Sequence, residues 1–443
     1  MRDQQVTTTA RQAGFAALAA IRSSGYANLV VNEVLTRAQL SSNDARFVTE
    51  LVYGTCRNQG TLDMVIEMAA GRELRTLQPA VVDVLRLGTQ QLLRMRVPAH
   101  AAVSSSVGLA KEQIGHRVAG VVNAILRRVA GRDWEEWLDL LTQGLDFRQA
   151  LAVRTCHPGW IVDAYAQCLP EPELAEALAA NNRPPLPTLA VRPSLMTREE
   201  LLAFGGEPTP YSEWGVARKG DPLEVAAVRD GRAGVQDEGS QLVAAVLARV
   251  DAPAGPWLDM CAGPGGKAAL LTGLARERSE QVVAADIHPH RVRLVADALQ
   301  GYPGPAPVMV ADGRTPAWGA CFSRVILDAP CTGLGALRRR PEARWRKTPA
   351  DLTTLVALQR ALLDRACQSV LPGGVVAYVT CSPHLGETAE VVAGQGGVEI
   401  LDAPALLPGV RQASASSDPR FIQLWPHRHG TDAMFCALLR RLE

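Results

Sequence analysis

The C-terminal half of the chain is constrained most by an alternation of short apolar runs with helix-like segments, which begins near residue 235. Each run has the length of a buried strand, and each segment between them is long enough to cross back over a sheet. The alternation predicts a doubly wound, largely parallel sheet with helices on both faces. The predicted strands are 256–260, 281–287, 307–311, 324–328, 374–380 and 398–401.

The chain has 443 residues, enough for several domains. From about 8 to 130 the apolar residues recur at helical spacing, which predicts an all-α bundle. Further short helices are expected up to the breaker cluster Asn181-Asn182-Arg183-Pro184-Pro185, and 186–232 is typical of a small α+β module. We therefore expect three parts. They are a helical domain at 1–140, linker helices with the small module at 141–232, and the α/β domain at 233–443.

Charge and cysteine usage exclude several classes of protein. Lys+Arg 46 against Asp+Glu 45 gives a net charge of +1, so bulk positive charge does not hold a nucleic acid partner. The nine cysteines contain no C-x-x-C pair, which predicts free thiols, no metal site and a cytoplasmic location. No stretch of 18 apolar residues occurs, so we expect no membrane span.

A glycine-rich turn, WLDMCAGPGGK at 257–267, joins the first predicted strand to a helix. Glycines let the backbone approach a ligand, and the N-terminus of the following helix offers free N–H groups to an anion. A tight turn from strand to helix needs glycine in any case. The turn alone is therefore weak evidence for a binding site.

Aspartates stand at or near the ends of the first four predicted strands: Asp259, Asp286, Asp312 and Asp328. Asp286 follows Gly266 by 20 residues, the spacing at which an acidic residue meets a ribose hydroxyl. Singly, each would be read as a solvated loop or cap residue. Together they predict a ligand crevice, and the missing phosphate-loop ending favours a nucleoside without pyrophosphate, such as S-adenosylmethionine.

Two cysteines directly follow predicted strands. Cys331 follows Asp-Ala-Pro at 328–330, and Cys381 follows Tyr-Val-Thr at 378–380. A cysteine is usually an inert buried side chain, and we accept that reading for most of the others. These two should lie beside the predicted nucleoside, because carboxyl ends of parallel strands share one edge.

Three motifs together resemble those of the RNA cytosine-C5 methyltransferases of the Sun family (the RsmB/Sun type). They are Cys-Ala-Gly-Pro-Gly-Gly-Lys at 261–267, Asp-Ala-Pro-Cys at 328–331 and Thr-Cys-Ser at 380–382. The helical part, with LVYG at 51–54, AHAAV at 99–103 and VNAILRR at 122–128, is similar to the NusB-like domain that precedes the catalytic domain in this family. The resemblance covers nearly the whole chain.

The resemblance implies a fold, an activity and a partner. The fold is an all-α NusB-like RNA-binding bundle, a small α+β module for RNA recognition and a Rossmann-like class I methyltransferase domain. The activity is transfer of a methyl group from S-adenosyl-L-methionine to C5 of a cytosine in small-subunit (16S) rRNA, through a covalent Cys–C6 adduct. We expect a monomer acting on a single-stranded or flipped cytosine. A cytosine of tRNA or another RNA, and a non-catalytic RNA-binding ribosome-assembly factor, are the alternatives.

The resemblance also implies residue roles. Cys381 is the nucleophile, Cys331 assists elimination, and Asp328 lies between the cofactor and the base. Asp286 holds the ribose with Arg291 nearby, and Asp312 meets the adenine edge. The cofactor's methionine part is expected against the loop residues Cys261, Ala262, Gly263, Pro264, Gly265, Gly266 and Lys267.

Two remaining features concern the substrate. The run RRRPEARWRK at 338–347 mixes cations with an aromatic ring and predicts a phosphate clamp with a stacking surface. Ala433 and Met434 stand where the family often has Gly and Phe, and Thr388 where it has Asn. We expect these departures on the substrate-facing rim, where they would affect the choice of nucleotide.

Overall fold

The computed structural model describes residues 9–23, 25–304 and 307–443, which form two compact units. The first contains the described residues up to Asp163 together with Leu337–Lys347, and the second contains Ala164–Ala336 and Thr348–Glu443. The chain therefore leaves the second unit after residue 336 and returns to it at residue 348.

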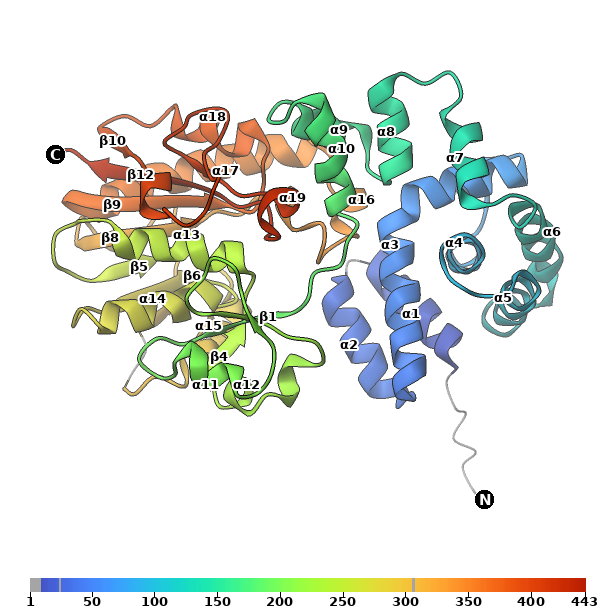
Figure 1. Cartoon of the computed structure of the whole chain (residues 1–443), viewed down its shortest axis with the longest axis horizontal. Helices are drawn as coiled ribbons and strands as arrows, with labels where there is room; N and C mark the ends of the chain where they lie inside the picture. The colour runs from blue at the N-terminus through green and yellow to red at the C-terminus, as the bar shows by residue number, and fades with distance from the viewer. Residues whose placement is uncertain (1–8, 24, 305–306) are drawn as a thin grey trace. The chain divides into compact units, whose positions relative to one another are not determined.

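The first unit is built from helices, as the spacing of its apolar residues predicts. Thr9 and Asp133 start two of them with capping boxes, because each side chain accepts a free N–H of the first turn. The apolar faces meet in one core around Leu51, Leu85 and Leu126. The helices, visible in Figure 1, are α1 (Ala10–Arg22), α2 (Ala27–Ala38), α3 (Ser42–Ala70), α4 (Pro79–Arg94), α5 (Ala99–Gln113), α6 (Ala119–Val129), α7 (Trp134–Thr142), α8 (Phe147–Thr155) and α16 (Ala343–Arg346).

The cationic run predicted to clamp RNA is largely absorbed into this helical unit. Arg344 is fully buried, and its guanidinium donates to the carbonyl O of Cys156 at 2.9 Å. The indole N–H of Trp345 donates to the carbonyl O of Cys56 at 2.7 Å, and Arg346 also donates to backbone carbonyls of α1 and its C-terminal loop. The predicted clamp is therefore wrong for Arg344, Trp345 and Arg346, because these side chains satisfy backbone acceptors of the bundle.

The second unit contains a mixed eight-stranded sheet in the order β10-β12-β9-β8-β5-β6-β7, with β11 paired to β12. The strands β5 to β9 run parallel, as the alternation predicts, whereas β12 pairs antiparallel with β9, β10 and β11. All six predicted strands are present, and β11 and β12 are additional. The bounds are β5 (Trp257–Asp259), β6 (Val282–Asp286), β7 (Val308–Val310), β8 (Phe322–Asp328), β9 (Val370–Thr380), β10 (Val398–Leu401), β11 (Ile422–Gln423) and β12 (Phe435–Arg441).

Helices cover both faces of this sheet. Along β9, Val375, Ala377 and Val379 pack into the cluster of α13 and α14, whereas Val376 and Tyr378 pack toward α17 and α18. Successive side chains of a strand point to opposite faces, so a strand covered on both sides is apolar throughout. The helices are α13 (Glu238–Arg249), α14 (Gly266–Arg276), α15 (Pro289–Leu299), α17 (Pro349–Ser369) and α18 (Ala389–Val392).

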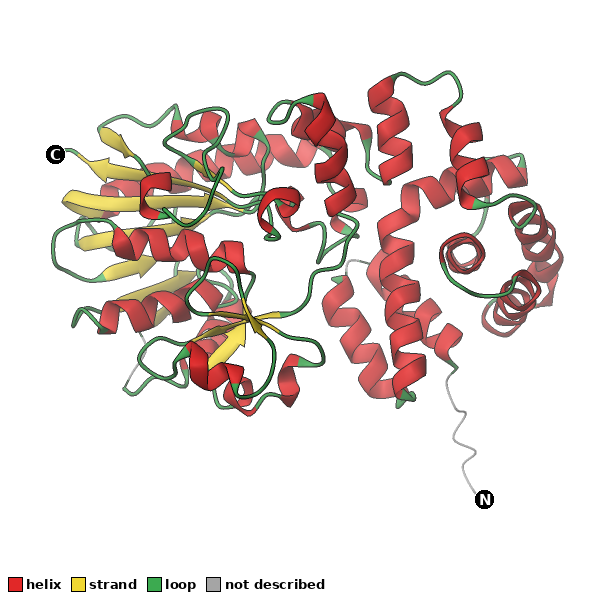
Figure 2. Cartoon of the chain, viewed as in Figure 1, coloured by secondary structure: helices red, strands yellow, loops and turns green. Residues whose placement is uncertain are grey.

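A second, antiparallel sheet lies in the same unit and has the strand order β2-β3-β1-β4. Figure 2 draws the strands of both sheets in yellow. Its strands are β1 (Thr188–Val191), β2 (Glu207–Pro208), β3 (Gly215–Ala217) and β4 (Ala233–Val235), with α11 (Arg198–Leu202) and α12 (Ala226–Arg229) beside them. This is the predicted α+β module, and its fourth strand comes from residues 233–235.

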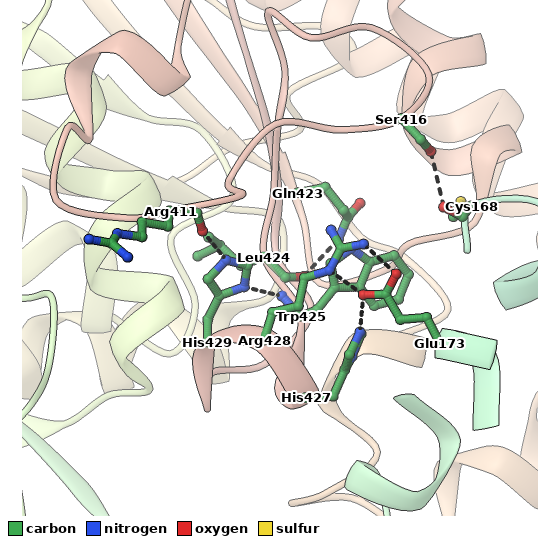
Figure 3. Close-up of polar contacts among 10 residues, drawn as sticks. All are labelled: Cys168, Glu173, Arg411, Ser416, Gln423, Leu424, Trp425, His427, Arg428 and His429. Carbon is green, nitrogen blue, oxygen red and sulfur yellow. Dashed lines mark hydrogen bonds and ion pairs between the residues drawn. The ribbon is translucent and has the colours of Figure 1, made fainter. Parts of the chain in front are cut away.

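Two helices precede this module, α9 (Gly159–Ala166) and α10 (Glu171–Ala180), and polar contacts join α10 to α19 (Pro426–His429). Figure 3 shows the carboxylate of Glu173 turned toward His427 and Arg428, with Arg428 Nη2 donating to Glu173 Oε2 at 2.8 Å. The hydrogen bond from Arg428 lowers the pKa of Glu173 to about 2 from its ordinary 4.5. Glu173 is therefore an ionised anchor for α10 at neutral pH.

Replacing this anchor should destabilise the protein in a pH-dependent way. A carboxylate with a lowered pKa stabilises the fold above its unfolded value of 4.5, and the contribution is lost as the pH falls toward 2. Because the site is partly solvated, we expect Glu173→Gln to lower the free energy of unfolding by about 1 kcal/mol at pH 7. Thermal unfolding at pH 7 and pH 3.5 checks this, and a difference that does not shrink at the lower pH would contradict it.

Among the described residues, no helix combines the length and the apolar character needed to cross a membrane.

Candidate functional site

The carboxyl ends of four parallel strands bring the predicted site residues to one edge of the sheet. In register, Asp259 of β5 lies opposite Ala284 of β6 and Ile326 of β8, and Asp328 of β8 lies opposite Val379 of β9. The loops that follow these strands therefore open side by side, as the prediction from strand polarity requires.

The loop after β5 leads into the N-terminus of α14. Gly265 caps this helix with φ of +110°, a conformation that favours glycine. A Cβ on Gly263 would come within 2.7 Å of both Arg291 Cβ and Asp286 Oδ2. The loop thus needs glycine at both positions, and its backbone lies directly against Asp286 and Arg291.

Asp286 is buried at the end of β6 and organises the loops around it. Its Oδ2 accepts the N–H of Gly263 at 3.1 Å, and its Oδ1 accepts the N–H of His288 at 2.9 Å. A carboxylate oxygen has two lone pairs, so each oxygen can accept a further hydrogen bond from a ligand hydroxyl.

A buried acidic cluster surrounds one lysine. Lys267 donates to Asp328 Oδ2 at 2.8 Å, with 10% of the lysine side chain exposed. Asp259 is fully buried, and neither of its carboxylate oxygens makes a hydrogen bond of normal geometry. Burial, and then the charge of Asp328, raise the pKa of Asp259 to about 8. Near neutral pH this shift favours the protonated form of Asp259, and a positively charged ligand beside it would favour the carboxylate.

The two predicted thiols lie in contact. Cys331 Sγ and Cys381 Sγ are 3.4 Å apart, and both residues are partly exposed. The loop after Cys331 is joined to Cys381 by the N–H of Gly335, which donates to the carbonyl O of Cys381 at 2.8 Å. A Cβ on Gly335 would approach the carbonyl O of Ala433 to 2.0 Å, so the close passage of these loops also requires glycine.

The environment makes the two thiols unequal. The hydrogen bond between them lowers the pKa of Cys381 and raises that of Cys331. Burial and the charge of Asp328 oppose ionisation of both thiols. Lys267 favours a Cys381 thiolate, whereas the charge of Glu387 further opposes ionisation of Cys331. These influences favour ionisation of Cys381 over that of Cys331.

The structure gives the surroundings of Asp312, and it corrects the expected placement of Thr388, Ala433 and Met434. Asp312 is held by its neighbour Arg314, with Nη2 and Oδ2 2.7 Å apart, and no hydrogen bond joins it to the other site residues in the described chain. The departures Ala433 and Met434 are buried at 0% and 2% exposure, and Thr388 at 2%. These three do not form a substrate-facing rim, because they pack inside the unit.

Two polar residues beside the thiols, Glu387 and Gln359, were not predicted as site residues from the sequence. Glu387 and Gln359 are fully buried, and both bond to the loop that carries Cys331. Gln359 could have been found as a polar residue in the apolar stripe that α17 forms with Leu362, Leu363 and Ala366. Its partners lie on other elements, and helical periodicity alone does not identify them.

Comparisons with known proteins agree with this geometry. The family model described as 16S rRNA methyltransferase RsmB/F matches residues 244–440, and the NusB family model matches residues 8–131. A Mycobacterium tuberculosis relative, named only as a methyltransferase, is 48% identical over 98% of this chain and 96% of its own length. Ribosomal RNA small subunit methyltransferase B of Pseudomonas putida is 32% identical over 98% of both chains.

Solved structures share the fold. PH0851 has a TM-score of 0.82 at 20% identity, covering 99% of this chain and 100% of its own. NSun6 from Pyrococcus horikoshii, solved with SFG, has a TM-score of 0.55 at 20% identity, covering 65% of this chain and 98% of its own.

Proposed function

This chain belongs to the RsmB/F family of methyltransferases, with a NusB-family domain at its N-terminal end, and on that premise we propose that it methylates C5 of a cytosine in 16S rRNA. The reaction proceeds through a covalent bond between Cys381 and C6 of the base. The observation that carries this proposal is the thiol pair, with Sγ atoms 3.4 Å apart and unequal tendencies to ionise.

The same pair weighs against a purely structural role in ribosome assembly. A scaffold that only binds RNA has no use for a reactive thiol beside a second, protonated one. It also has no use for a loop whose glycines admit a ligand to a buried acidic cluster.

The cofactor of a methyltransferase of this family is S-adenosyl-L-methionine, and the residues present fit it. The buried carboxyl group of Asp259 makes no hydrogen bond of normal geometry, so it can donate or accept one when a ligand enters. A molecule that carries a sulfonium and an ammonium would also favour its ionised form. The loop 261–267 takes the methionine part, Asp286 the ribose with Arg291 close by, and Asp312 the adenine edge. When bound, the cofactor supplies an electrophilic methyl group.

Removing the ribose partner should weaken cofactor binding. Asp286→Ala is expected to cost about 1.5–3 kcal/mol, because charge-assisted hydrogen bonds to the ribose and support for the loop are both lost. Calorimetry on the RNA-free protein measures this as a rise of about 10- to 150-fold in the dissociation constant. Asp297→Ala, an exposed carboxylate on α15, is the control. An unchanged constant for the Asp286 variant would remove this residue from the site.

The first chemical step falls to Cys381. Cytosine C5 is a poor nucleophile, and addition of the Cys381 thiolate to C6 turns it into an enamine carbon that can take the methyl group. The C5 proton then passes to a base, the C5–C6 double bond reforms, and Cys381 leaves as a thiolate. The Cys331 thiol assists this elimination by donating a hydrogen bond to the departing sulfur.

Asp328 acts at the pyrimidine edge. Its Oδ2 is bound to Lys267, which leaves Oδ1 to accept a hydrogen bond from a protonated N3. Protonation at N3 draws electrons away from C6 and so favours attack. Uracil already carries a proton at N3, so this arrangement does not activate its C6. Asp328 therefore selects cytosine.

We infer the substrate class from the relatives whose names specify small-subunit ribosomal RNA. A thiolate must approach C6 from above the ring, so the target cytosine must be unpaired or flipped out of a helix. We propose that the protein acts as a monomer in the cytoplasm, where its nine free cysteines stay reduced. A tRNA cytosine is the competing substrate.

Transfer of a labelled methyl group tests the substrate. The purified protein is offered small-subunit rRNA and tRNA from cells that lack this gene, and the labelled nucleotide is mapped. We expect label on one cytosine of the small-subunit rRNA. Label confined to tRNA would make tRNA the substrate, and no label on either RNA would favour the non-catalytic RNA-binding factor.

A further inference from the structure

We propose that Glu387 is the positioning residue that joins the two cysteine-bearing loops and assigns the nucleophile's part to Cys381 rather than Cys331. This inference deepens the proposed function and rests on it for the identity of the reaction. Glu387 ends the short 3₁₀ helix Leu385–Glu387, six residues after Cys381, and it is fully buried.

The hydrogen bonds of Glu387 converge on the residue after Cys331. Its Oε1 accepts the N–H of Thr332 at 2.7 Å, and its Oε2 accepts the hydroxyl of Thr332. The backbone of Glu387 is itself fixed, because the hydroxyl of Tyr378 in β9 donates to its carbonyl O at 2.8 Å. One buried carboxylate thus connects the β8 loop to the end of β9.

Cys331 is held on both sides by this arrangement. Gln359 Nε2 donates to the carbonyl O of Pro330 at 2.8 Å and to Glu387 Oε1 at 3.1 Å. On the other side, the hydroxyl of Thr332 lies 3.3 Å from that of Ser382, the residue after Cys381. The residues that flank both thiols are therefore tied into one network, which accounts for the contact between the two sulfurs.

The charge of Glu387 acts differently on the two thiols. The hydrogen bonds described for its carboxylate come from neutral donors, Thr332 and Gln359, so they do not cancel its charge. That charge raises the pKa of Cys331, whereas Lys267 lies on the side of Cys381 and lowers its pKa. Glu387 and Lys267 together direct the negative charge of the pair to Cys381.

A dithiol probe tests the positioning without RNA or cofactor. Phenylarsine oxide bridges two close thiols with loss of water, and its adduct on the full-length chain is counted by mass spectrometry. The Cys331→Ala variant, which cannot form this bridge, gives the background level of the adduct. Glu387→Ala should weaken bridging about 10- to 100-fold, the loss expected when buried hydrogen bonds are removed. Glu387→Gln, whose amide oxygen still accepts the N–H of Thr332, should stay close to wild type.

The control for this probe is Glu390→Ala, an exposed carboxylate three residues away, which should bridge like wild type. Wild-type bridging in Glu387→Ala would overturn the positioning role. Equal losses in the Ala and Gln variants would overturn it as well, since they would point to a general packing defect.

Alkylation tests the effect of charge. In a Cys381→Ala background, the rate at which iodoacetamide modifies Cys331 at pH 8 reports how much thiolate it forms. Adding Glu387→Gln removes a negative charge with little change in shape, so Cys331 should react several-fold faster. An unchanged rate would contradict the proposal that Glu387 makes Cys381, and not Cys331, the nucleophile.

Turnover completes the test. Glu387→Ala should lower kcat about 10- to 100-fold while the KM values for RNA and cofactor stay within about twofold, because Glu387 acts through Cys331 and touches neither substrate. Equal changes in kcat and KM would contradict this role. If the wild-type protein methylates an atom other than C5, the proposed function fails, and the probe and alkylation results still decide the role of Glu387.

Discussion

Replacing Cys381 with Ala or Ser should reduce methyl transfer by about a thousandfold or more, to the background of the assay. Alanine has no nucleophile, and the serine hydroxyl does not ionise near neutral pH, so neither can add to C6. The structure gives Cys381 a lowered pKa through Cys331 and Lys267, an advantage that no hydroxyl can reproduce. Transfer of labelled methyl groups under single-turnover conditions measures the loss.

Cofactor binding separates this chemical defect from a folding defect. Both Cys381 variants should bind S-adenosylmethionine with nearly the wild-type dissociation constant. Cys321→Ala, which removes an exposed thiol outside the site, should keep full turnover. Wild-type turnover by either Cys381 variant would remove this residue from the mechanism.

The Cys331→Ala variant should remain covalently attached to its RNA. Cys381 can still add to C6 and the methyl group can still be transferred, but the departing sulfur lacks the hydrogen bond that the Cys331 thiol donates across 3.4 Å. The trapped adduct should appear as a band of retarded mobility in denaturing gels. Because the bond is a thioether, reducing agents should leave this band unchanged.

Two further variants test the order of addition and elimination. Cys381→Ala should give no such band, and the double variant should behave like Cys381→Ala, since addition precedes elimination. An adduct that accumulates only in Cys381→Ala would exchange the two roles. No adduct with any variant would mean that Cys331 is structural and that Cys381 leaves without its hydrogen bond, the C5 proton passing to a group such as water or Asp328.

The parallel strands and the site residues at their carboxyl ends could be predicted from the sequence, because each produces a pattern within a few neighbouring residues. The strand ends at Asp259, Asp286 and Asp328 followed from strand length and polarity, because parallel strands deliver their carboxyl ends to one edge. The thiol pair was found for the same reason: Cys331 and Cys381 each come directly after such a strand. The antiparallel pairing of β12 with β9 was not predicted, because a local apolar run such as 435–439 does not identify its long-range partner.

The cationic run at 338–347 shows where local reading fails. A stretch rich in arginine with one tryptophan is typical of a solvated RNA-binding surface. Its burial in the helical unit depends on backbone carbonyls, such as those of Cys56 and Cys156, that accept hydrogen bonds from its side chains. Acceptors of this kind carry no side-chain signature. Glu387 and Gln359 escaped for the same reason, because the partners that give them a role lie on other elements.

Release of tritium from C5 tests the central claim most directly. RNA that carries tritium at C5 of its cytosines is incubated with the protein and S-adenosylmethionine, and tritium in water is counted against methyl groups in RNA. The account predicts one tritium released per methyl group transferred, with both signals lost in Cys381→Ala. Methyl transfer without tritium release would contradict it, because the methyl group would then reside on an atom other than C5.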